Sequence, residues 1–303
     1  MTAVRFMATL AGALTLQGAC CAQAGAQQAD TDGMVNYEFQ NQIKLMSEQR
    51  TRGVSDSLMQ PSLKWTTQFV HASGFIALLE VAKVSKKQFV DGDGLGITAA
   101  AGYRFGNPDA WHAGVGLATE RFPGASFLAP HRIDLQAGTP EDIRRTDYDS
   151  DFGVLELGYG AVEGRVLYVF SKTYRGADTG GVCAQILQFA ADPTVALRCF
   201  ARGEHDSRGT LLGDLNYQTP LLPALLPSTT LRLHAGYQKL RNFSEGSFAD
   251  YQIGVTHKHW GLDWNLDWVS TRVNAHELYW VQDGARIRKT DGDTLVASIG
   301  YAF

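Results

Sequence analysis

Apolar and polar residues alternate along most of the chain from residue 35 onward. In one run, Leu63, Trp65 and Phe69 are separated by polar residues such as Lys64 and Gln68. A period of two predicts β-strands, because successive side chains of a strand point to opposite faces of its sheet. The regular alternation indicates a sheet whose two faces meet different solvents.

Twelve such runs can be counted, and the links between them tend to alternate between short and long. An even number of strands with short periplasmic turns and long external loops is typical of bacterial outer-membrane barrels. The sequence therefore predicts an all-β fold, a single antiparallel transmembrane β-barrel of about 12 strands. The expected strands span about 35–52, 61–72, 75–85, 94–105, 111–121, 150–160, 164–175, 209–218, 229–240, 248–257, 262–271 and 294–303.

The last run ends on an aromatic residue. Leu295, Ala297, Ile299 and Tyr301 alternate with smaller or polar residues up to the terminal Phe303. Outer-membrane barrels characteristically present such a phenylalanine to their assembly machinery, so that machinery is an expected partner. A soluble β-sandwich whose final strand ends in Phe is the competing interpretation.

The first residues have the layout of an export signal. Arg5 precedes an apolar run over 6–16, and small residues end in Ala22-Gln23-Ala24. We expect residues 1–24 to be a signal peptide and 25–303 to form the barrel, located in the bacterial outer membrane; a second possible cleavage follows Ala26. Lipidation at Cys20 is an alternative, but Gln17 stands where a lipoprotein signal favours an apolar residue.

Charge and hydropathy narrow the class further. The formal net charge is −4, and it becomes −5 without residues 1–24, which contain Arg5 and no acidic residue. A negative chain argues against nucleic acid as a partner. No later stretch approaches the roughly 20 consecutive apolar residues of a spanning helix, so membrane residence would require a barrel.

Two cysteines remain after the expected signal, Cys183 and Cys199. In an oxidising compartment two thiols favour one disulfide, here closing a loop within the long link at 176–208. A metal site is a weaker reading, because only His205 lies near them. No cofactor is expected.

Five segments stand out: residues 51–57 (Thr-Arg-Gly-Val-Ser-Asp-Ser), Gln60-Pro61, 72–75, 246–255 and 261–264. Of these, Arg-Gly-Val-Ser at 52–55 and Asp-Tyr-Gln-Ile-Gly at 250–254 go beyond alternation, and together the segments resemble the TorF porin family. The resemblance implies an outer-membrane barrel that acts as a channel by architecture, and it brings no catalytic residues. The long insertion with Cys183 and Cys199 departs from the family.

The polar residues that alternate with the apolar ones predict an interior lined by charges of both signs, with a slight excess of acidic residues. Fixed charges of both signs around a narrow pore would sort small polar solutes and ions, so we interpret the barrel as a passive channel. A closed interior filled by these side chains is the structural alternative, because small barrels are filled and large ones open. The residues expected at the constriction are Lys64, Arg165, Asp214, Arg232, His234, Asp263 and Asp267.

Two further classes of function stay open. An outer-membrane lipid hydrolase would need a nucleophile, and no Ser stands in a Gly-x-Ser-x-Gly context; His234, on the same parity as Asp214, is the candidate base. A purely structural or adhesive barrel would use its long loops. In one loop, His131-Arg132 and Arg144-Arg145 are candidates for binding lipopolysaccharide phosphates. The sequence leaves the oligomeric state and the conformation of 176–208 undetermined.

Overall fold

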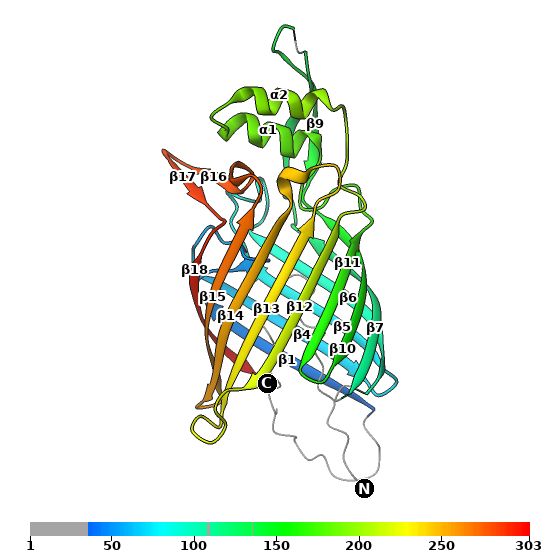
Figure 1. Cartoon of the computed structure of the whole chain (residues 1–303), viewed down its shortest axis with the longest axis vertical. Coiled ribbons are helices and arrows are strands. Elements are labelled where there is room, and N and C mark those ends of the chain that lie inside the picture. Colours follow the sequence, from blue (N-terminus) through cyan, green and yellow to red (C-terminus); the bar gives the residue numbers. More distant parts are fainter. Residues whose placement is uncertain (1–35, 108–109, 135) are drawn as a thin grey trace.

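Twelve antiparallel strands form a closed barrel in the computed structural model, which describes residues 36–107, 110–134 and 136–303 (Figure 1). This confirms the predicted fold class. The barrel strands are β1 (Tyr37–Met46), β4 (Ser62–His71), β5 (Phe75–Lys83), β6 (Leu95–Gly106), β7 (Trp111–Arg121), β10 (Ser150–Tyr159), β11 (Val162–Val169), β12 (Leu211–Pro220), β13 (Thr229–Lys239), β14 (Phe248–His259), β15 (Leu262–Val273) and β18 (Thr294–Ala302).

The first and last strands close the barrel. Strand β18 pairs with β15 on one side and with β1 on the other, where Ile43 faces Tyr301. Every barrel strand thus has two hydrogen-bonded neighbours. A closed sheet leaves no unpaired backbone edge, which is the condition for a sheet to sit in lipid. The expected signal peptide, 1–24, lies outside the described residues.

Exposed apolar and buried polar residues alternate along the strands as the sequence predicted. On β4, Leu63 and Trp65 are 52% and 38% exposed, whereas Lys64, Thr66 and Gln68 between them are at most 9% exposed. On this strand apolar side chains therefore face outward and polar ones inward, the reverse of a soluble protein. Among the described residues, none of the helices combines the length and the apolar character needed to cross a membrane.

The first strand is shorter than predicted. It ends at Met46 rather than at residue 52, and the chain then forms a two-stranded hairpin inside the barrel, β2 (Arg50–Thr51) and β3 (Val54–Ser55). The turn residues Arg52 and Gly53 both have positive φ, +50° and +78°, as two-residue hairpin turns often require. We call residues 50–55 the inner hairpin. The seventh strand likewise ends earlier, at Val169 instead of 175.

The two ends of the barrel differ. Short turns connect strands at the end where the C-terminus lies, and the longer links fold into a cap at the other end (Figure 1). The cap elements are the hairpin β8 (Ser126–Ile133) and β9 (Pro140–Asp147), the helices α1 (Thr179–Phe189) and α2 (Pro193–Ala201), the 3-10 helices η1 (Ser244–Gly246) and η2 (His276–Tyr279), and the hairpin β16 (Trp280–Asp283) and β17 (Arg286–Lys289).

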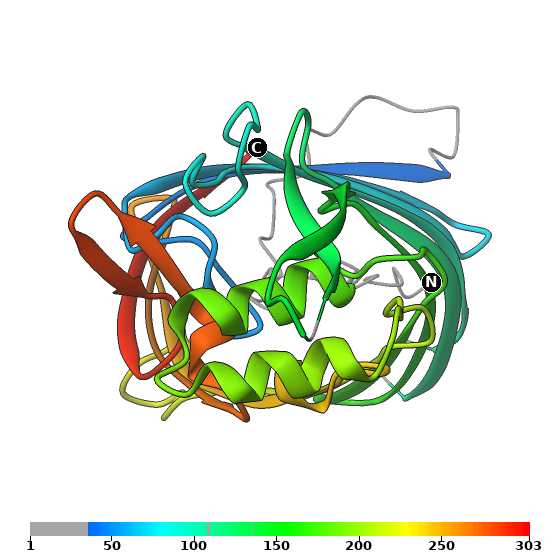
Figure 2. The ribbon, with the colours of Figure 1, turned by 90° about the horizontal axis from the view of Figure 1, so that it is seen from above.

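The helical pair lies across the mouth of the barrel (Figure 2). Asp178 and Asp192 cap the two helices by accepting hydrogen bonds from Gly181 N and Thr194 N. A disulfide joins Cys183 of α1 to Cys199 of α2, with their Cα atoms 5.5 Å apart, as the sequence predicted. Both cysteines are buried in an apolar cluster that continues into the barrel wall. The loop 176–208 is therefore a packed lid rather than an extended chain.

Candidate functional site

The barrel interior is the candidate site, because it gathers charged side chains from nearly every strand. All seven residues expected at the constriction are buried on the inward face, with exposed fractions from 0% for Asp267 to 9% for His234. Their assignment to a conducting pore stays a prediction. The alternation in the sequence gives only the face on which a side chain lies. The structure also shows which of the seven residues form ion pairs.

Two ion pairs bridge neighbouring inward positions. Lys64 Nζ lies 3.1 Å from Glu80 Oε2, across the β4–β5 ladder. Arg232 Nη2 donates to Asp267 Oδ1 at 2.6 Å, and Gln252 Nε2 donates to the same oxygen at 2.8 Å. Such charge-assisted hydrogen bonds are about twice as strong as neutral ones and hold the side chains in place.

The backbone leaves room for the second pair. Gly254 on β14 faces Asp267 across the ladder, and a Cβ at this position would collide with the carboxylate. Glycine is therefore required here by close approach rather than by flexibility.

The inner hairpin adds a cation to the centre of the interior. Arg52 Nη1 donates to Asp214 Oδ1 on β12 at 2.5 Å, and its Nη2 lies 3.6 Å from Asp250 Oδ1 on β14. Thr271 Oγ1 on β15 donates to the carbonyl oxygen of Gly53 at 2.9 Å. The hairpin is thus tied to three wall strands from the inside.

His234 belongs to the same group. Its Nε2 lies 2.6 Å from Asp250 Oδ2, and its Nδ1 lies 3.0 Å from Asn216 Oδ1. Both ring nitrogens have a partner, and the carboxylate is that of Asp250 rather than of Asp214. A histidine bonded on both sides serves the interior network, and among the described residues its ring nitrogens contact Asn216 and Asp250 rather than a nucleophile.

A second cluster lies nearer the turn end, on β6, β10 and β11. Glu156 accepts from Arg104 Nε at 2.8 Å and from Arg165 Nη2 at 3.2 Å. Arg165 Nη2 also donates to Glu163 at 2.6 Å. Of these four residues only Arg165 was expected at the site. Parity could have found the others, since Arg104 and Glu156 each stand between two outward apolar residues.

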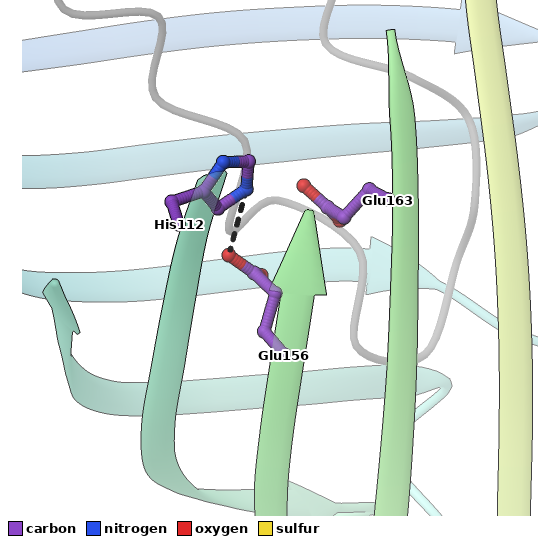
Figure 3. Close-up of side chains that lie close together, drawn as sticks. All are labelled: His112, Glu156 and Glu163. Carbon is purple, nitrogen blue, oxygen red and sulfur yellow. Dashed lines mark ion pairs between the residues drawn. The ribbon is translucent and has the colours of Figure 1, made fainter. Parts of the chain in front are cut away.

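His112 completes a set that resembles a metal site (Figure 3). Its ring nitrogen and one oxygen each from Glu156 and Glu163 lie within 4.8 Å of one another. Arg104 and Arg165, however, already contact both carboxylates. Two fixed positive charges oppose the entry of a divalent cation, because the repulsion is strong in a buried site. We read the set as part of the ion-pair network.

The outer end of the interior holds a further buried cation. Arg175 follows β11 and lies 2.9 Å from Asp56 Oδ2 and 3.2 Å from Glu120 Oε2. Burial by itself would lower the pKa of Arg175, but the attraction of Asp56 and Glu120 outweighs it and raises that pKa. Its guanidinium also lies over the rings of Phe89 and Phe122.

Two of the loop residues expected to bind lipopolysaccharide are held by carboxylates of the protein. His131 is buried and its Nε2 lies 3.1 Å from Asp178 Oδ2. Arg144 reaches Glu204 at 2.7 Å and Asp142 at 3.1 Å. Contact with lipopolysaccharide stays a prediction for the exposed arginines, and His131 does not face the outside.

A cavity of about 510 Å³ lies above the inner hairpin, and we call it the vestibule. Thr51, Arg52 and Val54 of the inner hairpin line it on one side, and α1 lines it on the other with residues such as Gln185. The lid and the hairpin are thus separated by open space at the barrel mouth. This cavity could not be read from the sequence, because its lining comes from segments far apart along the chain.

Comparisons with known proteins give a family. The profile of a family described as "Bacterial protein of unknown function (Gcw_chp)" matches residues 29–303. No curated protein matches the sequence. Similar solved structures include the KdgM porin (10% identity, 87% of this chain and 99% of that chain, TM-score 0.43), the NanC porin (7%, 88% and 98%, 0.43) and an outer membrane channel from Pseudomonas putida F1 (9%, 90% and 99%, 0.37). These likenesses concern barrel architecture alone.

Proposed function

This chain belongs to the Gcw_chp family of bacterial proteins, and we propose that it is an outer-membrane channel for small polar or ionic solutes. In this proposal residues 1–24 direct export and are removed, and the barrel inserts with its cap outside the cell. The resemblance to the TorF porin family supports the same function and stays a prediction.

The observation that carries the proposal is the division of the barrel into an apolar outside and a charged inside. Outward residues in mid-strand are apolar, as at Leu155 (61% exposed) and Leu266 (54%), whereas their neighbours Glu156 and Asp267 are buried. An outer surface of this kind requires lipid, and an interior of this kind requires water or ions. Solutes moving through such an interior would meet fixed charges of both signs.

The inner hairpin would set the narrowest part of the path. Arg52 reaches from the hairpin to Asp214 and Asp250 on the wall, so the hairpin occupies space that a solute would otherwise cross. A small solute could pass by replacing the contacts of Arg52 with contacts of its own. A large solute would be excluded, because the hairpin would still occupy part of the path. The channel is therefore expected to conduct weakly and selectively.

A closed structural barrel is the second candidate. It is favoured by the burial of the interior side chains, since Lys64, Arg165 and Arg232 are each at most 4% exposed. In a barrel of intermediate size, filling the interior would be a sufficient role for side chains that are paired so tightly. In that case the cap would be the working surface.

Single-channel recording separates the two candidates. The mature protein, refolded and inserted in a planar bilayer, should give discrete conductance steps, with ion selectivity read from the reversal potential in a salt gradient. Silence from protein whose folding is confirmed by heat-modifiable gel mobility would overturn the channel and leave the closed barrel.

A further inference from the structure

The vestibule has a size suited to a small organic molecule. Its volume of about 510 Å³ falls in the range of roughly 300–1,000 Å³ typical of small-molecule sites. Helix α1 lines it on one side and the inner hairpin on the other, so it stands between the cap and the charged interior. A solute entering from the cap side would meet this space first.

Aromatic rings form much of the wall. They come from separate segments of the cap and of the strand ends, and they include Phe127, Tyr148, Phe248, Tyr279 and Trp280. Burial raises the pKa of Tyr148 to about 12, so its phenol is neutral at any physiological pH. Aromatic faces carry partial negative charge and attract the weakly positive C–H groups of a ligand.

The charged residues of the lining are each paired with carboxylates, the two arginines in buried contacts and Lys87, which is 59% exposed, in a surface pair. Among the described lining residues they are three cations, Arg52, Lys87 and Arg175. Each already has carboxylate partners: Arg52 has Asp214 and Asp250, Arg175 has Asp56 and Glu120, and Lys87 has Asp283. The vestibule and its surroundings therefore favour neither an anionic nor a cationic head group.

Uncharged polar groups are abundant instead. Five glutamines line the vestibule: Gln88, Gln185, Gln188, Gln238 and Gln282. The buried atoms Gln88 Oε1, Gln238 Oε1 and Trp280 Nε1 have no hydrogen-bond partner among the described residues. Most buried polar atoms are hydrogen-bonded, so two acceptors and one donor around one cavity call for an explanation.

We propose that the vestibule binds a neutral saccharide of one or two rings. A sugar ring presents C–H groups on its faces, which pack on aromatic rings, and hydroxyls at its edge, which both donate and accept hydrogen bonds. These three atoms are covered in the structure, and rotation of their side chains toward the vestibule would let the glutamine oxygens accept from hydroxyls and the indole N–H donate to one. The proposal names a solute class for the channel and in that respect rests on the proposed function, although binding does not require conduction.

Calorimetric titration of the mature protein with maltose tests the site. The protein is held in a detergent without a sugar head group, such as a dimethylamine oxide, because a maltoside would compete. We expect saturable binding of maltose, and much weaker binding of glucuronate and glucosamine than of glucose, because these two carry opposite charges on the same single ring. Preference for either ion over glucose would overturn the neutral class.

Three variants locate the binding. Trp280→Ala should weaken maltose binding about tenfold, because an aromatic platform and a donor are both lost. Gln88→Ala removes one acceptor with little effect on folding and should weaken it about threefold. Trp260→Ala is the matched control, since Trp260 is 81% exposed in the turn after β14, at the other end of the barrel. Equal loss in Trp260→Ala, or no loss in the other two, would overturn the site.

Conductance recorded on the same samples separates this inference from the channel. Conducting protein that neither binds maltose nor is blocked by it from the cap side would overturn the saccharide site and leave the channel. Protein that binds maltose and stays silent would overturn the channel and support the vestibule as a binding site of a closed barrel.

Discussion

Arg52 Nη1 donates a hydrogen bond to Asp214 Oδ1 at 2.5 Å and so fastens the inner hairpin to strand β12 inside the barrel. Both side chains are almost fully buried, at 2% and 0% exposed. The contact joins residues 162 positions apart and crosses the interior rather than following the wall. The hairpin therefore occupies space inside the barrel and is held there by the wall.

Arg52→Ala should therefore widen the path. Removing the guanidinium leaves Asp214 and Asp250 buried without their cation, which should lower the free energy of unfolding by about 3–5 kcal/mol and free the hairpin. Single-channel conductance should rise relative to the wild type. Arg272→Ala is the control, because Arg272 is 61% exposed and pairs with Asp293 outside the interior. Unchanged conductance in a folded Arg52→Ala protein would show that the hairpin does not limit flow.

The pair Arg232–Asp267 predicts opposite changes of ion selectivity. Arg232→Ala removes a positive charge from the interior and should move the reversal potential toward cation selectivity. Asp267→Asn removes the negative partner and should move it toward anion selectivity. Measurement in a tenfold salt gradient gives both signs, with exposed Arg286 on β17 replaced by Ala as the control. Shifts of the same sign in both variants would contradict a path along this pair.

The disulfide should stabilise the lid and not the barrel. Cys183 and Cys199 are 16 residues apart, and closing a loop of this length contributes about 3 kcal/mol in the chain-entropy model. Cys183→Ser should therefore speed hydrogen exchange across α1 and α2, while heat-modifiable gel mobility of the barrel stays as in the wild type. Cys199→Ser should behave identically. A barrel that loses its heat-modifiable mobility in either variant would show that lid and barrel fold as one unit.

The sequence predicted the barrel because alternation is a local signal that every strand repeats. Twelve expected strands match the twelve of the barrel to within a few residues, except where the first and seventh run on into inward or cap segments. The seven expected interior residues face inward for the same reason. The inner hairpin was missed because residues 47–52 are all polar, so no apolar spacing marks the change from wall strand to hairpin, and the left-handed Arg52 has no sequence signal of its own.

The cap could have been partly foreseen. Asp192 followed by Pro193 is a typical helix start, since aspartate caps the first turn and proline suits its first position. The vestibule could not, because Gln88, Gln238 and Trp280 come from three segments with no common pattern. Only the fold brings them together. The alternation along a strand shows on which face a residue lies, but not how far along the barrel axis it lies.

Insertion into lipid, as distinct from conduction, can be tested at Leu155. Its side chain is 61% exposed on β10, beside outward Val115 and Val166 on the two neighbouring strands. If this face lies in hydrocarbon, Leu155→Arg should cost about 2–4 kcal/mol near the midplane, where a charge cannot be hydrated. Unfolding in urea from lipid vesicles measures that cost directly.

The matched control for this change is Leu128→Arg. Leu128 is 68% exposed on β8, in the cap beyond the barrel, so an arginine there would stay in water and should change stability by less than about 0.5 kcal/mol. The two leucines differ little in exposure, which means that a soluble barrel would tolerate both arginines alike. A large difference between them therefore requires a second solvent around the strands, and equal effects would place the whole protein in water.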